Sequence, residues 1–116
     1  MGVDVSGLGR LALDLTSSGA KVRQGASSAL GVSAQQVAAT ARQLAPVDTG
    51  ALRSSIQVRG GMGLERSVEA TAGHAPFVEY GTSTHAPQPF MRPAADAAEP
   101  LLAAKLADVA SRVLDG

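Results

Sequence analysis

Apolar residues recur every three or four positions in the first half of the chain, and this spacing predicts helices. We expect a short helical segment within residues 6–17 and a long helix across residues 20–45. Gly25 and Gly31 each lower the intrinsic stability of the long helix by about 1 kcal/mol relative to alanine, so this helix should need packing partners. Pro46 ends it, because proline cannot continue the helical hydrogen-bond ladder.

The same spacing returns near the end of the chain and predicts a last helix over residues 93–114. Pro93 suits the first turn of a helix, where a missing N–H costs nothing. Pro100 lies inside the predicted helix and should kink or restart it.

Apolar and polar residues alternate in the middle of the chain, which indicates strands. Ile56 and Val58 begin one strand, and residues 64–72 alternate throughout except at Arg66, which stands on the apolar face. The glycine-rich stretch 60–63 separates the two runs. Two strands around such a connection predict a β-hairpin.

Residues 76–80, with the sequence PFVEY, predict a third short strand. A period of two would place Phe77 and Glu79 on one face of this strand and Val78 and Tyr80 on the other.

The length of 116 residues indicates one domain over residues 1–116. The order of elements indicates an α+β fold, with helices packed on a small antiparallel sheet. Its parts are a short helical N-terminal segment (1–19), a long helix (20–45), a sheet (54–80), a proline-rich loop (81–92) and a C-terminal helix (93–114).

The composition makes the expected core thin. Alanine supplies 22 of the 52 apolar residues, and it removes little surface from water at about 25 cal/mol per Å². Either partner subunits complete the burial or the chain is a modestly stable monomer.

The charge and the lack of cysteine exclude some functions. Ten basic residues balance ten acidic ones, whereas tight binding of DNA draws on many lysine and arginine contacts to phosphates. With no cysteine, the chain forms neither a disulfide framework nor a thiolate zinc site.

Bulk and stiffness gather in the segment 74–93, HAPFVEYGTSTHAPQPFMRP. It holds all three aromatic residues, both histidines and four of the six prolines of an otherwise alanine-rich chain. His74, Glu79 and His85 could be metal ligands of a hydrolase, but their spacing matches no zinc motif. Ser83 has no nucleophile elbow around it. The sequence therefore does not indicate an enzyme, a metal or a cofactor.

Two patterns in the chain carry a family resemblance. The first is Ala45-Pro46-Val47-Asp48-Thr49-Gly50-Ala51-Leu52-Arg53-Ser54-Ser55-Ile56, and the second joins Phe77-Val78-Glu79-Tyr80-Gly81-Thr82 to Pro87-Gln88-Pro89-Phe90-Met91-Arg92-Pro93-Ala94. In this order, with a hairpin between them, they resemble the minor tail component family of long-tailed phages, over residues from about 20 to the end. His74 departs from the pattern, because family members often have an aromatic residue there.

The resemblance implies a structural virion protein at the head–tail junction, serving as a neck, tail completion or tail terminator protein. It implies a ring of six or twelve copies between the capsid connector and the tail tube, through which double-stranded DNA passes without sequence-specific binding. It implies no catalytic residue and no membrane contact. The protein would reside in the virion, and in the host cytoplasm during assembly.

The candidate structural and interface residues come from the two patterns. Asp48 and Thr49 are good N-cap residues for a single helical turn, and Gly50 would allow a close backbone approach there. The full set is Asp48, Thr49, Gly50, Leu52, Phe77, Glu79, Tyr80, Gly81, Thr82, Pro89, Phe90, Met91 and Pro93.

Phe90 is the expected anchor of the stiff loop 81–92. It either closes the core of its own domain or docks on a neighbouring subunit, and the sequence leaves both versions open. A monomeric module that binds a protein or peptide with this loop is the alternative to a ring subunit.

Overall fold

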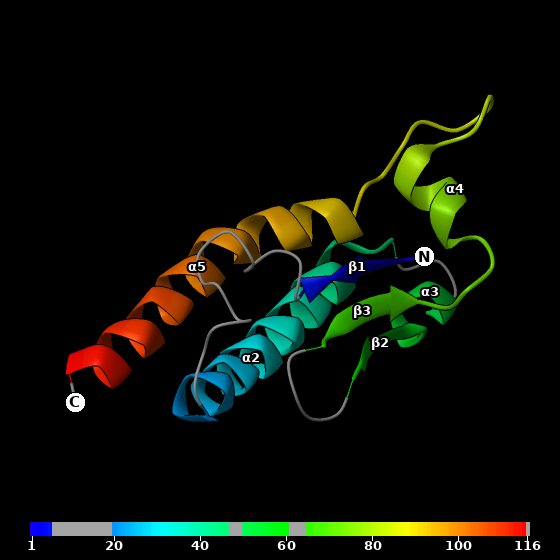
Figure 1. The fold of residues 1–116 in the computed structure, drawn as a ribbon. Coiled ribbons are helices and arrows are strands. Elements are labelled where there is room, and N and C mark those ends of the chain that lie inside the picture. The colour runs from blue at the N-terminus through cyan, green and yellow to red at the C-terminus, as the bar shows by residue number, and fades with distance from the viewer. Residues whose placement is uncertain (6–19, 47–49, 61–64, 116) are drawn as a thin grey trace.

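The computed structural model describes residues 1–5, 20–46, 50–60 and 65–115, and it shows an elongated α+β fold with extents of 55 × 22 × 20 Å (Figure 1). The described elements are β1 (Gly2–Asp4), α2 (Ala20–Leu44), α3 (Ala51–Ser54), β2 (Ile56–Arg59), β3 (Ser67–Ala70), α4 (Ala75–Tyr80) and α5 (Met91–Asp115). The predicted fold class is confirmed, as are the two long helices. The helix expected within residues 6–17 lies outside the described residues.

The helices α2 and α5 run antiparallel along each other and form the long body of the molecule (Figure 1). Small side chains let them approach closely. The buried alanines of the two helices are Ala26, Ala29, Ala34, Ala38 and Ala41 in α2, and Ala94, Ala95 and Ala98 in α5. A Cβ atom added at Gly25 would lie 2.6 Å from Cγ1 of Val109, so this glycine is needed for the packing of α5 against α2.

The sheet has three antiparallel strands in the order β1-β3-β2. The predicted hairpin is confirmed as β2 and β3, with Ile56 opposite Ala70 and Val58 opposite Val68. Its third strand is β1, at the start of the chain, where Val3 also lies opposite Val68. Strands β2 and β3 contact α2, and β1 contacts α5, so the sheet lies against one end of the helix pair.

The prediction of a third strand over residues 76–80 is wrong, because this segment forms the helix α4. Pro76 stands in its first turn, where proline fits a helix without losing a hydrogen bond. The buried residues Ala75 and Glu79 are four positions apart, which is a helical period rather than that of a strand.

The helix α5 continues through Pro100, so the expectation of a restart there is wrong. Pro100 lies on the exposed side of the helix. The carbonyl group that loses its partner at this point can therefore bond to water, which lowers the cost of an internal proline.

Arg66, the exception on the apolar face of the hairpin, lies buried across α2. Its Nη2 donates to Oγ of Ser27 at 3.3 Å, and its Nη1 donates to the carbonyl oxygen of Glu65 at 3.2 Å. A Cβ atom at Gly31 would lie 3.7 Å from Nε of Arg66. The guanidinium group thus extends along a side of α2 that serine and glycine keep open.

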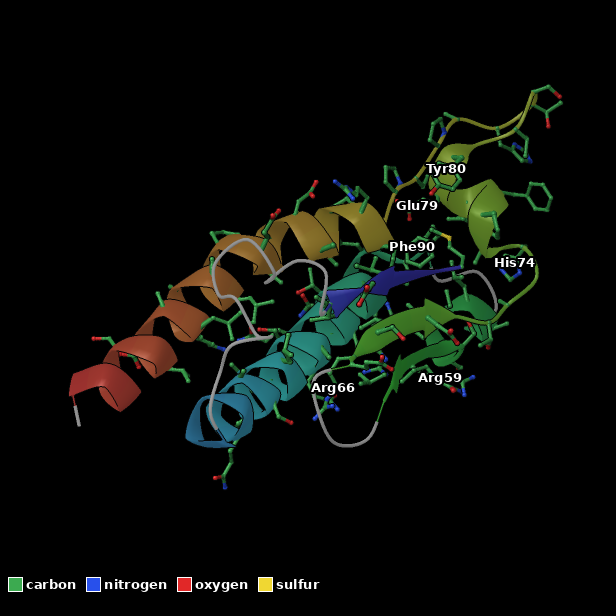
Figure 2. The ribbon with its side chains drawn as sticks, in the orientation of Figure 1. Arg59, Arg66, His74, Glu79, Tyr80 and Phe90 are labelled. Carbon is green, nitrogen blue, oxygen red and sulfur yellow. The ribbon has the colours of Figure 1, made fainter. Side chains whose placement is uncertain are left out.

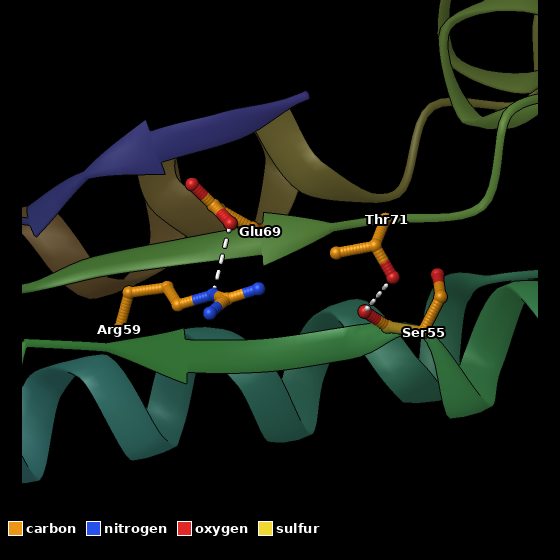
Figure 3. A network of polar contacts seen from close by, with 4 residues as sticks. All are labelled: Ser55, Arg59, Glu69 and Thr71. Atoms are coloured by element: carbon orange, nitrogen blue, oxygen red, sulfur yellow. Dashed lines mark hydrogen bonds and ion pairs between the residues drawn. The ribbon is translucent and has the colours of Figure 1, made fainter.

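The outer face of the hairpin carries polar contacts (Figure 3). Nε of Arg59 and Oε2 of Glu69 form an ion pair at 3.0 Å, and Oγ1 of Thr71 donates to the carbonyl oxygen of Ser55 at 3.4 Å. An exposed pair of this kind contributes at most about 1 kcal/mol. It marks this face as an ordinary charged, solvated surface.

Candidate functional site

Residues 75–90, which we call the arm, project from the end of the body where α5 begins (Figure 1). The arm consists of α4 and the loop 81–90, and the loop folds back on the helix. The backbone N–H of Gln88 donates to the carbonyl oxygen of Val78 at 2.8 Å, and that of Gly81 donates to Phe77 at 2.9 Å. The arm is therefore an ordered hairpin-like unit.

Glycine is required at the turn between α4 and the loop. Gly81 has φ of 80°, and a Cβ atom there would lie 2.9 Å from the carbonyl oxygen of His85 and 2.9 Å from the nitrogen of Pro87. After this turn, Oγ1 of Thr82 accepts from the N–H of His85 at 3.0 Å and from that of Thr84 at 3.3 Å. Pro89 is exposed near the end of the loop.

Glu79 joins the arm to the body. Its Oε1 accepts from the backbone N–H groups of Phe90 at 3.1 Å and Met91 at 2.9 Å, and its Oε2 accepts from that of Arg92 at 3.1 Å. The carboxylate is buried between the two elements (Figure 2). A negative charge at this position also interacts favourably with the positive end of the α5 dipole.

This contact accounts for every free backbone donor of the first turn of α5. A helix leaves its first four N–H groups without a partner inside the helix. Glu79 binds those of Phe90, Met91 and Arg92, and Pro93 has no N–H. The second sequence pattern thus brings together a carboxylate and the helix start that it caps.

Phe90 and Met91 are fully buried in the core of the chain, with Phe90 0% exposed. The version in which Phe90 closes its own domain agrees with the structure. The version in which Phe90 docks on a neighbouring subunit is wrong, because none of its side chain is left at the surface.

The other two aromatic residues are the exposed part of the arm. Phe77 is 61% exposed and Tyr80 is 73% exposed, although large apolar side chains are usually buried. Because α4 is a helix whose buried residues are Ala75 and Glu79, Phe77 and Tyr80 lie on its exposed side, and Figure 2 shows Glu79 and Tyr80 on this helix. The aromatic cluster of the sequence is therefore divided in the structure, with Phe90 buried and Phe77 and Tyr80 exposed.

An open groove of about 520 Å³ lies between the arm and the end of α2. It is lined by Pro46, His74, Phe77, Val78, Thr82, Thr84, His85, Ala86 and Gln88. Glu79 is not among these residues, since its oxygens face α5. Among the described residues, no three side chains of the types that bind metals lie together.

The first sequence pattern forms the turn between α2 and the sheet. Gly50 takes the N-cap position of α3 with φ of 78°, a left-handed conformation that favours glycine, and a Cβ atom there would meet no neighbour. The expected close approach at Gly50 is therefore wrong, and the positive φ is the reason for the glycine. Leu52 is buried in the core. Asp48 and Thr49 lie outside the described residues.

Two arginines fasten this turn. Nη2 of Arg42 donates to the carbonyl oxygen of Ile56 at 2.7 Å, and Nε of Arg53 donates to that of Arg42 at 3.1 Å. These bonds hold the end of α2 beside the start of β2.

The family model described as "Bacteriophage HK97-gp10, putative tail-component" matches residues 10–81. The chain belongs to this family. The matched region contains α2, the turn at Gly50, the hairpin and α4, and it ends at the glycine that reverses the arm. The backbone N–H groups that donate to Glu79 lie beyond the matched region. No curated protein and no solved structure matches the chain.

Proposed function

We propose that the chain is a structural subunit of the virion that forms a ring at the head–tail junction. The ring, of six or twelve copies, joins the capsid connector to the tail tube and surrounds the path of the DNA. Neck, tail completion and tail terminator protein are the posts that such a subunit can hold.

The observation that carries this proposal is the exposure of Phe77 and Tyr80 on a projecting, capped arm, in a member of a phage tail-component family. Aromatic residues are enriched in protein interfaces, where they supply large contact areas at little entropic cost. The arm is already ordered by Glu79, so binding of a partner does not require the loss of conformational entropy that ordering a flexible segment would cost.

The charge and the helices are compatible with a conduit. The formal net charge is +0, so a lumen lined by this chain need not bind phosphates and slow the DNA. Among the described helices, none combines the length and the apolar character needed to cross a bilayer.

The groove beside the arm favours a second candidate function. A monomeric module could bind a peptide between Pro46 and the arm, in the open space of about 520 Å³. Such a module would use Phe77, which lines the groove, but it would have no need to meet a second copy.

Particle analysis separates the two. Phages that lack this protein should accumulate DNA-filled heads and complete tails that are not joined, and electron microscopy of intact virions should show a ring containing the protein. Virions that contain the protein in one or two copies only, or that assemble normally without it, would contradict the ring.

A further inference from the structure

The charged side chains of the described surface are distributed unevenly, and the part of α2 from Gln24 to Leu44 contains a single charged residue. Its exposed residues between Gln24 and Leu44 include no charged side chain. The one charged residue of that stretch, Arg42, donates to the carbonyl oxygen of Ile56. A solvated helix normally has charged residues on its outer face.

Seven of these residues share one side of the helix, and we call them the α2 stripe. Apart from the adjacent pair Gln35 and Gln36, they recur every three or four positions, which places them along one side of an α-helix. The α2 stripe consists of Gln24, Ser28, Val32, Gln35, Gln36, Ala39 and Gln43. Within it Val32 is 48% exposed, a large apolar side chain among neutral amides.

The outer surface of the arm is uncharged in the same way. Between residues 75 and 90 the one carboxylate is Glu79, which is buried, and there is no lysine or arginine. Elsewhere the surface is charged: the sheet carries Arg59 and Glu69, and α5 carries an ion pair of Arg92 with Asp96 at 3.2 Å. Interfaces are depleted of charged residues in this manner.

We propose that the arm of one copy docks on the α2 stripe of the next copy. The chemistry of the two surfaces is complementary: Phe77 can pack on Val32, and the hydroxyl of Tyr80 can exchange hydrogen bonds with glutamine amides. Neither surface presents a charge that the other would leave unpaired. The inference rests on the proposed ring and names the contact that closes it.

In the proposed ring, the partner that the α2 stripe binds is a second copy of the chain. The arm and the α2 stripe lie on different elements, so every copy carries both surfaces. The arm is clasped by Glu79 to the start of α5, at the end of an elongated body, whereas the α2 stripe runs along the body. Each copy therefore offers its arm to one neighbour and its stripe to another. Such head-to-tail contacts generate a closed ring when the rotation between copies closes.

Thiol cross-linking tests the contact, since the chain contains no cysteine. The variant with Tyr80→Cys and Gln35→Cys together, treated with a short bis-maleimide in purified virions, should give a ladder of covalent oligomers. A mixture of the two single variants should stop at dimers. The matched control combines Tyr80→Cys with Glu99→Cys on the exposed side of α5, and it should give no ladder.

The outcomes separate the contact from the ring. A ring without a ladder from the Tyr80–Gln35 pair, or a ladder from the control pair, overturns the contact and leaves the ring. Cross-links from Tyr80→Cys to a different virion protein also overturn it. The absence of any ring in virions overturns both proposals.

Charge insertion gives an independent reading. Gln35→Glu with Gln36→Glu places two carboxylates in the α2 stripe and should weaken self-association roughly tenfold or more, since a charge buried without a partner is costly. The melting temperature of the isolated subunit should not change. Ala107→Glu, on the exposed side of α5, should leave self-association intact. Equal self-association in the two variants would contradict the contact.

Discussion

The aromatic side chains at the two ends of the arm differ in their exposure to solvent. Phe90, where the loop enters α5, is fully buried in the core, whereas Phe77 and Tyr80 on α4 are mostly exposed. All three lie within fourteen residues of an aromatic-poor chain, at positions 77 to 90. Although they are close in sequence, they lie in two different environments, the core and the surface.

The residues at the buried end hold the arm to the body, whereas those on the exposed side face the solvent. Glu79 and Phe90 bind the arm to the first turn of α5 through backbone donors and core packing. Phe77 and Tyr80 make no comparable contribution to the fold. The residues that hold the fold and the residues that we propose for assembly are thus separate within one segment, so their effects can be measured separately.

The largest effect is expected at the buried end. Phe90→Ala should lower the free energy of unfolding of the isolated subunit by about 3–5 kcal/mol, because it leaves a cavity in the core. Thermal melting of the dilute subunit measures this. An unchanged melting temperature would contradict the burial of Phe90 in its own domain.

Removing the cap should have a smaller effect on the same measurement. Glu79→Ala leaves the N–H groups of Phe90, Met91 and Arg92 without their acceptor, and should cost roughly 1.5–3 kcal/mol. Glu79→Gln, which keeps one acceptor oxygen but loses the charge, should fall between this variant and the wild type. Amide hydrogen exchange at Met91 should quicken in both. Unaltered exchange at that amide would exclude the capping role.

Two glycine substitutions in α2 test the packing of the body without changing the arm. Gly25→Ala meets Cγ1 of Val109 at 2.6 Å, and this overpacking should lower stability by about 1 kcal/mol or more. Gly31→Ala finds its nearest neighbour at 3.7 Å, and it should raise stability by up to about 1 kcal/mol through better helix propensity. Denaturant unfolding of the two variants should shift the midpoint in opposite directions. Shifts of the same sign would show that the α2–α5 packing differs from that described.

The smallest change in stability is expected at the exposed side. Phe77→Ser and Tyr80→Ser should each shift the free energy of unfolding of the isolated subunit by less than about 0.5 kcal/mol, as is usual for surface substitutions. Analytical ultracentrifugation of the assembled form should, in contrast, show weaker self-association for each single variant and a loss of oligomer when the two substitutions are combined. A large drop in melting temperature with normal assembly would reverse the roles of the two ends.

The sequence predicted the elements whose patterns extend over several turns or along a hairpin. The helices α2 and α5 and the strands β2 and β3 have such patterns, so local periodicity was enough. It did not reveal β1, because Gly2–Asp4 is too short to show an alternation and is held by pairing with β3.

The error at α4 has a different cause. Phe77, Val78 and Tyr80 favour a strand locally, and a helix of six residues is marginal by itself. The carboxylate of Glu79 and the start of α5 decide between the two through a contact over eleven to thirteen residues of sequence. Pro76, which suits a first helical turn, was the signal that could have indicated the helix.

The role of the exposed side of the arm is best tested by the proportion of joined particles made by a phage that carries both Phe77→Ser and Tyr80→Ser. We expect the subunit to stay folded, with a melting temperature close to that of the wild type, while filled heads and finished tails accumulate separately. Normal yields of complete virions from this phage would contradict the claim that the exposed side of the arm serves assembly.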